Sequence, residues 1–131
     1  MRRRAAALLL LLVCVAVVAC GSSGPAVVTP PPNTGIDLLT EAAPTCPVQR
    51  LGQPCVRPIS ARVTVLRGKT MVTTVQTGED GKARVPLPPG TYTLQGQATG
   101  TGFPRPPAAA TVTVVSGAYA PVRVDYDTGI R

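Results

Sequence analysis

The sequence predicts an all-β domain, and three observations support this prediction. Several short segments alternate apolar and polar residues with the two-residue period of a β-strand. Pro and Gly are abundant, with 15 and 13 residues, and they separate these segments as turn residues do. Aromatic residues make up only 3% of the chain, while Val and Thr recur in the alternating segments. This mixture favours short strands over helices.

The clearest strand pattern lies in residues 77–94. Asp80-Gly81 is a tight-turn dipeptide, because Gly tolerates the positive φ that such turns require. Alternating residues predict a strand at 82–87, and a Pro-Pro-Gly corner separates it from a second strand at 91–99. Pro86 lies inside the first of these two strands. Because Pro cannot donate a ladder hydrogen bond, we expect that strand at the edge of a sheet.

The same alternation predicts five further strands elsewhere in the chain, at residues 36–40, 61–65, 71–77, 110–114 and 119–127. The first of them is weakly patterned. In the third, the buried face is open between Met71/Thr73/Val75 and Val72/Thr74. Seven short strands with turns every 8–12 residues are typical of an immunoglobulin-like sandwich.

The N-terminal residues have the features of an export signal. Three arginines at residues 2–4 precede an apolar stretch at 5–18. This stretch of about 14 residues is shorter than the ~20 that a transmembrane helix needs, and it fits a signal peptide. It ends in Val17-Val18-Ala19-Cys20, which resembles the lipobox of bacterial lipoproteins. The resemblance implies cleavage before Cys20 and a lipid on its thiol, with palmitate among the acyl chains.

This interpretation divides the chain into three parts and sets its location. Residues 1–19 are expected to be the signal peptide, 20–34 a disordered Pro/Gly/Ser-rich tether, and 35–131 the β-sandwich. We expect the protein at the cell membrane, anchored by lipid on the extracytoplasmic side. An ordinary cleaved signal peptide with a free Cys20, or an uncleaved anchor, remains the alternative.

The charge of the chain predicts no nucleic-acid partner. The formal net charge is +7, and removing the three arginines of the leader leaves +4. A charge of this size is ordinary for a soluble domain. The remaining Lys and Arg residues are scattered along the sequence, whereas nucleic-acid-binding proteins gather them on one face or stripe.

Cys46 and Cys55 are the cysteines that remain once Cys20 carries lipid and Cys14 leaves with the leader. Because exported chains fold in an oxidising compartment, we expect these two to form a disulfide. The alternative is a redox or metal pair. Their separation is not that of a Cys-x-x-Cys motif, and the chain contains no His.

The motif in residues 77–94 resembles the carboxypeptidase regulatory-like domain. It has a Thr at 77, the Asp80-Gly81 turn, a strand, a Pro-Gly corner, and then Tyr92 and Leu94 in alternation. The resemblance covers residues 59–126. It implies the seven-stranded prealbumin-like topology that Cna-B repeats also have, and an accessory role beside enzymes or on cell surfaces.

The residue types give little support to catalysis, and we expect no enzyme. Nucleophilic catalysis requires a positioned base, and the chain has no His. Asp125 and Asp127 lie on one strand face, where two acids could act as acid and base, but charge pairing on an exposed sheet is the preferred interpretation. Glu79 and Asp80 fit a solvated turn better than a weak calcium site. We therefore predict no metal and no cofactor.

The loops offer two candidate binding sites, since sandwiches usually place function there. Phe103 and Arg105 lie in a Gly/Pro-rich loop at 100–107, and an exposed aromatic beside Arg is typical of binding hot spots. The alternative is that Phe103 folds back over the end of the sandwich. Arg50 and Leu51, in the disulfide loop, form the second candidate.

These features predict a non-catalytic, membrane-anchored lipoprotein. Its sandwich would serve as a binding or accessory module for an envelope protein or a polysaccharide. A purely structural envelope protein without a specific ligand is the alternative. An enzyme that uses the Asp125/Asp127 face is the third possibility.

Overall fold

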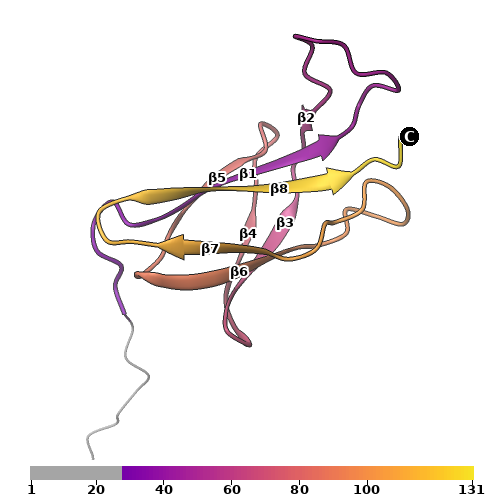
Figure 1. Cartoon of the computed structure of the whole chain (residues 1–131). Coiled ribbons are helices and arrows are strands. Elements are labelled where there is room, and N and C mark those ends of the chain that lie inside the picture. Colours follow the sequence, from indigo (N-terminus) through magenta and orange to yellow (C-terminus); the bar gives the residue numbers. More distant parts are fainter. Residues whose placement is uncertain (1–27) are drawn as a thin grey trace, which may run out of the picture.

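A computed structural model describes residues 28–131, which form eight strands in two facing four-stranded sheets (Figure 1). The prediction of an all-β sandwich is therefore confirmed. The predicted signal peptide, Cys20 and the tether up to residue 27 lie outside the described residues. No helix among residues 28–131 is long and apolar enough to cross a membrane.

The first sheet is organised around β1 (Gly35–Ala43), its central strand. β8 (Tyr119–Asp127) pairs with β1 in parallel along its whole length. On the other side of β1, β5 (Lys82–Pro86) pairs with the first half of β1 and β2 (Arg57–Pro58) with the second, both antiparallel. Because β5 pairs with β1 alone, the edge position predicted from its proline is confirmed.

The second sheet is antiparallel, in the order β4-β3-β6-β7. Its strands are β3 (Arg62–Arg67), β4 (Thr70–Gln76), β6 (Gly90–Gly96) and β7 (Ala110–Val114). In β4, Thr73 and Val75 are partly buried while Met71 and Val72 are exposed. This resolves the open choice of buried face in favour of the one that includes Val75, which packs against the core.

The seven predicted strands are all present, and β2 is an additional, eighth strand. The predicted bounds differ from the observed ones by one or two residues in three strands, and by three residues at the ends of two others. The strand expected at 36–40 extends to Ala43, and the strand expected at 91–99 ends at Gly96. β1 extends further because its inward positions continue through Thr40 and Ala42, which are both buried.

The core lies between the sheets and consists of alternate residues from both of them. Tyr92 and Tyr126 are the largest fully buried side chains. The buried members of the core cluster are Ile36, Leu38, Ala61, Val63, Val65, Val85, Leu87, Tyr92, Leu94, Val112, Val114, Val124 and Tyr126. Two aromatic rings therefore fill much of a core that is otherwise built from small and branched side chains.

A buried polar junction connects the two sheets beside the β4–β5 turn. The hydroxyls of Thr40 and Thr77 lie 2.7 Å apart. Thr77 Oγ1 also accepts the Ala61 N–H at 2.9 Å, and Thr40 Oγ1 donates to the Ile59 carbonyl at 2.6 Å. Gly81 has a φ of 72° in the turn, and its carbonyl accepts the Thr40 N–H at 2.8 Å. The Thr and the Asp-Gly turn of the sequence motif thus join β1, β3 and β5.

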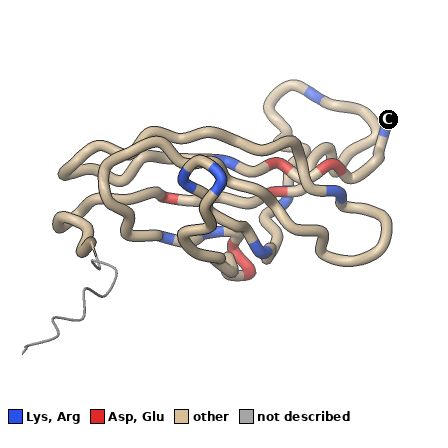
Figure 2. The backbone as a smooth tube through the Cα atoms, turned by 90° about the horizontal axis from the view of Figure 1, so that it is seen from below, with Lys and Arg blue, Asp and Glu red and all other residues tan. Residues whose placement is uncertain are grey.

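The described chain enters the sandwich at Thr34, which is fully buried. Its carbonyl accepts the Leu87 N–H at 3.1 Å, and its hydroxyl accepts the Gly117 N–H at 2.8 Å. The entry point therefore lies beside the β5–β6 corner and the β7–β8 turn. The C-terminus lies at the opposite end of the sandwich (Figures 1 and 2).

Candidate binding surface

Three segments gather at the end of the sandwich that lies opposite the chain entry (Figure 1). They are the disulfide loop (residues 44–56), the β6–β7 loop (97–109) and the C-terminal tail (128–131). We call these segments together the distal surface. It contains both pairs of residues that the sequence singled out for binding.

The β6–β7 loop is fixed to the end of β8 by backbone and side-chain hydrogen bonds. The Arg105 N–H donates to the Asp127 carbonyl at 2.8 Å, and the Asp127 N–H donates to the Arg105 carbonyl at 2.9 Å. At the start of the loop, the Tyr126 hydroxyl donates to the Gln97 carbonyl at 2.9 Å. Burial raises the pKa of Tyr126, so its hydroxyl remains protonated as the donor.

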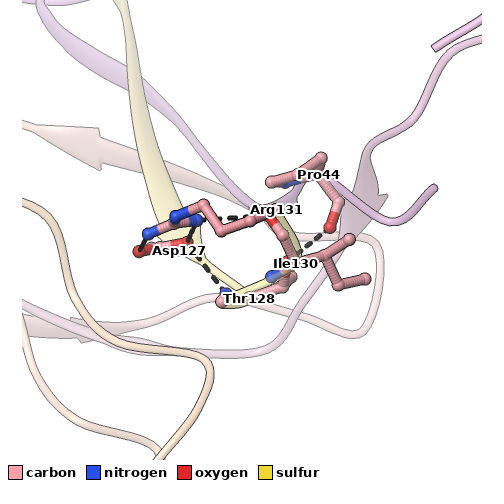
Figure 3. Close-up of polar contacts among 6 residues, drawn as sticks. Pro44, Asp127, Thr128, Ile130 and Arg131 are labelled. Atoms are coloured by element: carbon pink, nitrogen blue, oxygen red, sulfur yellow. Dashed lines mark hydrogen bonds and ion pairs between the residues drawn. The ribbon is translucent and has the colours of Figure 1, made fainter. Parts of the chain in front are cut away.

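The C-terminal tail folds back onto the end of β8 (Figure 3). Arg131 donates two hydrogen bonds to the Asp127 carboxylate, at 2.8 and 3.1 Å, and the Gly129 N–H donates a third at 2.9 Å. Thr128 Oγ1 makes a short hydrogen bond to the Pro44 carbonyl. These contacts connect the tail to β8 and to the start of the disulfide loop.

The same contacts lower the pKa of Asp127 to about 2. The Arg131 hydrogen bonds are the largest cause, followed by the Gly129 N–H, and the nearby charges of Arg131 and Arg105 add to them. Each of these partners favours the ionised carboxylate. Asp127 is thus an anion at neutral pH, whereas a general acid needs a pKa near the working pH.

The Arg131→Gln variant is expected to raise the pKa of Asp127 from about 2 towards its ordinary 3.8, because it removes the main hydrogen-bond donor. Since the folded pKa lies below the unfolded value, the stabilisation by Asp127 is present above about pH 4 and is lost as the pH falls through about 2. An NMR titration of the Asp127 carboxyl measures both states. Arg123→Gln is the control and should leave this pKa unchanged. A wild-type titration near pH 4 would contradict the assignment.

The Phe103 side chain partly folds back over the end of the sandwich and partly remains exposed, so each of the two expected arrangements holds in part. Its ring lies against Gly129 of the tail, where φ is 78° and an added Cβ would come within 2.6 Å of the ring. The Arg105 guanidinium also lies over the ring, 4.5 Å from its centroid. The side chain nevertheless remains 53% exposed. Phe103 is therefore a fixed aromatic group with an open face.

The predicted disulfide between Cys46 and Cys55 is confirmed. The Thr45 N–H donates to the Cys55 carbonyl at 2.8 Å, and the Gln53 N–H donates to the Arg50 carbonyl at 3.1 Å. Arg50 is exposed, and Leu51 is fully exposed at the tip of the loop. The crosslinked loop thus displays an apolar side chain beside a cation.

Asp125 and Asp127 lie on one face of β8 as predicted, but each has its own cation. Arg123 Nε lies 3.8 Å from Asp125 Oδ1 and 3.3 Å from Glu41 Oε2, while Asp127 pairs with Arg131. Glu41, which the sequence analysis missed, is largely buried on the neighbouring strand. Extending the alternation of β1 beyond Thr40 would have placed it on the same face as Arg123.

A shallow hollow of about 580 Å³ lies on the outer face of the first sheet. Two of its three charged lining residues neutralise each other, because Arg84 donates to both Asp37 oxygens, at 2.7 and 3.0 Å. Those bonds are the main cause of the lowered pKa of Asp37. Arg84 also stacks over Tyr119, 4.4 Å from the ring centroid. This pairing leaves Lys82 as the charged lining residue that forms no ion pair within the described range.

The part of the chain that the structure describes has no group of three His, Cys, Asp or Glu side chains placed to hold a metal ion. Glu79 and Asp80 are exposed, and Asp80 Oδ1 accepts the Lys82 N–H within the turn at 3.0 Å.

No family model matches the chain, and no curated protein matches it. The likeness to the carboxypeptidase regulatory-like domain thus depends on the motif in residues 77–94.

Proposed function

We propose that this protein is a non-catalytic, lipid-anchored accessory protein of the cell envelope that binds another envelope protein through the distal surface. Its sandwich would be a prealbumin-like module of the carboxypeptidase regulatory-like kind. A lipobox-like leader and a disulfide support export and anchoring. The sequence motif and the two-sheet architecture support the assignment of the module.

The arrangement of the chain ends is the observation that carries the proposal. The chain enters at Thr34, beside the β7–β8 turn, and the distal surface lies at the other end (Figure 1). A lipid on Cys20 would hold the Thr34 end towards the membrane. The distal surface would then face away from the membrane, where a partner can reach it.

The composition of the distal surface favours a protein partner. Phe103 and Leu51 are exposed, and each has an arginine nearby in its own loop, Arg105 and Arg50. Aromatic residues and Arg dominate hot spots in protein interfaces. The hydrogen bonds of Arg105 and the tail fix this surface before binding, which lowers the entropy cost of association. The disulfide loop and the β6–β7 loop contain two basic and no acidic residues, so the matching partner surface has an apolar patch with acidic neighbours.

The double variant Phe103→Ala/Arg105→Ala is expected to weaken partner binding at least tenfold, because it removes the exposed ring and its stacked cation. Capture from crosslinked envelope extract would identify the partner, and titration of the purified pair would measure Kd. Val72→Ala/Lys82→Ala is the matched control. It removes an exposed apolar residue of β4 and an exposed cation of β5, both outside the distal surface, and should leave Kd unchanged.

Two results would contradict the binding proposal. One is that the wild type captures no protein. The other is that the Phe103→Ala/Arg105→Ala variant and its control bind equally well. If the wild type captures a polysaccharide in place of a protein, the distal surface is retained as the binding site but the class of ligand changes.

Cys20→Ala is expected to release the protein from membranes, because it removes the only thiol in the lipobox-like sequence. Acylation by two or more chains gives stable anchoring, so the loss should be nearly complete in a membrane fractionation. Cys14→Ala is the matched control, since that residue lies within the predicted leader and should leave membrane retention unchanged. Retention of the Cys20→Ala variant would overturn the anchor.

A further inference from the structure

We propose that the domain also docks onto anionic lipid through a surface beside the chain entry. This basal surface consists of Arg67 at the end of β3, Lys69 in the β3–β4 turn, Met71 near the start of β4, and Val115 directly after β7. The inference depends on the lipid anchor proposed above. It adds a second membrane contact that orients the folded domain.

A hydrogen bond connects Arg67 to the β5–β6 corner, which lies beside the chain entry. The Arg67 guanidinium donates to the Pro89 carbonyl at 3.4 Å and lies 5.7 Å from the centroid of the Tyr92 ring. Two residues before Pro89, the Leu87 N–H donates to the carbonyl of Thr34. Strand pairing sets Val114 opposite Gly90, so Val115 belongs to the same end. In Figure 1 the β3–β4 turn and the first described residues both lie on the lower side.

The charge on this surface is positive, and no carboxylate of the described residues neutralises it. Arg67 and Lys69 are exposed, and neither forms an ion pair with any residue of the described range 28–131. Asp37, the nearest acidic residue along β1 to the chain entry, is neutralised by Arg84. In Figure 2 the β3–β4 turn faces the viewer with basic positions and no acidic ones. The negative surface potential of anionic lipid attracts cations placed in this way.

Two exposed apolar side chains flank these cations. Met71 is 64% exposed and Val115 is 57% exposed. Side chains of this kind can enter the boundary between head groups and acyl chains while Lys and Arg bind the head groups. Anionic lipid fits this combination better than a soluble polyanion, which offers nothing to the apolar groups.

A lipid on Cys20 makes this docking intramolecular. Because the tether joins the domain at the same end, it keeps the basal surface at high effective concentration near the bilayer. Weak contacts from two cations are then sufficient to bias the orientation of the folded domain relative to the bilayer. Docking would hold the distal surface away from the membrane, towards a partner.

The test uses the lipidated full-length chain in vesicles, with a fluorescent NBD group on the exposed first residue of β4 in a Thr70→Cys variant. We expect a blue shift of the NBD emission in vesicles with 30% phosphatidylglycerol, relative to pure phosphatidylcholine, and its loss in high salt. Arg67→Gln/Lys69→Gln should reduce the docked fraction, at about fivefold in the docking equilibrium per charge removed. A second label at Leu51→Cys should show no shift.

Arg57→Gln/Lys82→Gln is the control variant, since it removes two exposed cations elsewhere and should retain the blue shift. If the chain floats with both kinds of vesicle but its NBD emission is equal in them, docking is overturned and the anchor is upheld. A shift that survives Arg67→Gln/Lys69→Gln would also overturn the proposed charge recognition. If the chain does not float with either vesicle, the anchor fails, and this inference fails with it.

Discussion

Reduction of the Cys46–Cys55 disulfide is expected to lower the free energy of unfolding by about 2.5 to 3 kcal/mol. The bond closes a loop with a sequence separation of 9 residues, and the estimate follows from the chain entropy that such a loop removes from the unfolded state. For a domain of this size the loss corresponds to roughly 10–20 °C in Tm. Denaturant and thermal unfolding, with and without reductant, measure it.

The structure also indicates where reduction acts locally. Cys55 is buried, and β2 follows it directly and pairs with Glu41 and Ala42 at the end of β1. We therefore expect faster hydrogen exchange at the Arg57 N–H, the one amide hydrogen of β2, and at the Thr45 N–H, which donates to the Cys55 carbonyl, before the core opens. Cys46→Ala/Cys55→Ala is the preferred variant, since serine would add a buried hydroxyl at Cys55. An unchanged midpoint in both experiments would contradict a stabilising role for the bond.

The strands were predictable from the sequence wherever burial of one sheet face imposes alternation. β7 and β8 have the predicted bounds because apolar and polar residues alternate throughout them. The alternating pattern of β1 is weak because its inward positions end in Thr40 and Ala42, which are buried without being strongly apolar. β2 has only two residues, and no period can be read from so short a segment.

The candidate residues at the distal surface were predictable, but their arrangement was not. Phe103 and Arg105 were identified from residue type and loop context, which are local features. The contacts that fix them are long-range: Arg105 pairs with Asp127, and Tyr126 binds the Gln97 carbonyl across 29 residues of sequence. The pairing of Arg131 with Asp127 was not predicted. The reversal of Arg131 onto Asp127 depends on the positive φ of Gly129.

Thr77→Val is expected to lower the free energy of unfolding by about 1 to 3 kcal/mol. Valine has nearly the same shape as threonine but cannot accept the Ala61 N–H or bind the Thr40 hydroxyl. These groups lie in the buried junction between β1 and β3, and an unpaired buried polar group carries its full desolvation cost. Chemical denaturation of the variant and the wild type measures the difference.

Thr77→Ser separates the hydroxyl from the methyl group. Serine keeps the acceptor for Ala61, so it should cost less than valine even though it leaves a small void. If valine is tolerated better than serine, the junction is held by packing and the hydrogen-bond assignment is wrong. The expected order would give the motif threonine a role in the fold: its hydroxyl is buried between the sheets, beyond the reach of a ligand, and it fixes the Asp-Gly turn against β1. Partner binding by the Thr77→Ser variant should then match the wild type, since the distal surface is made by other residues.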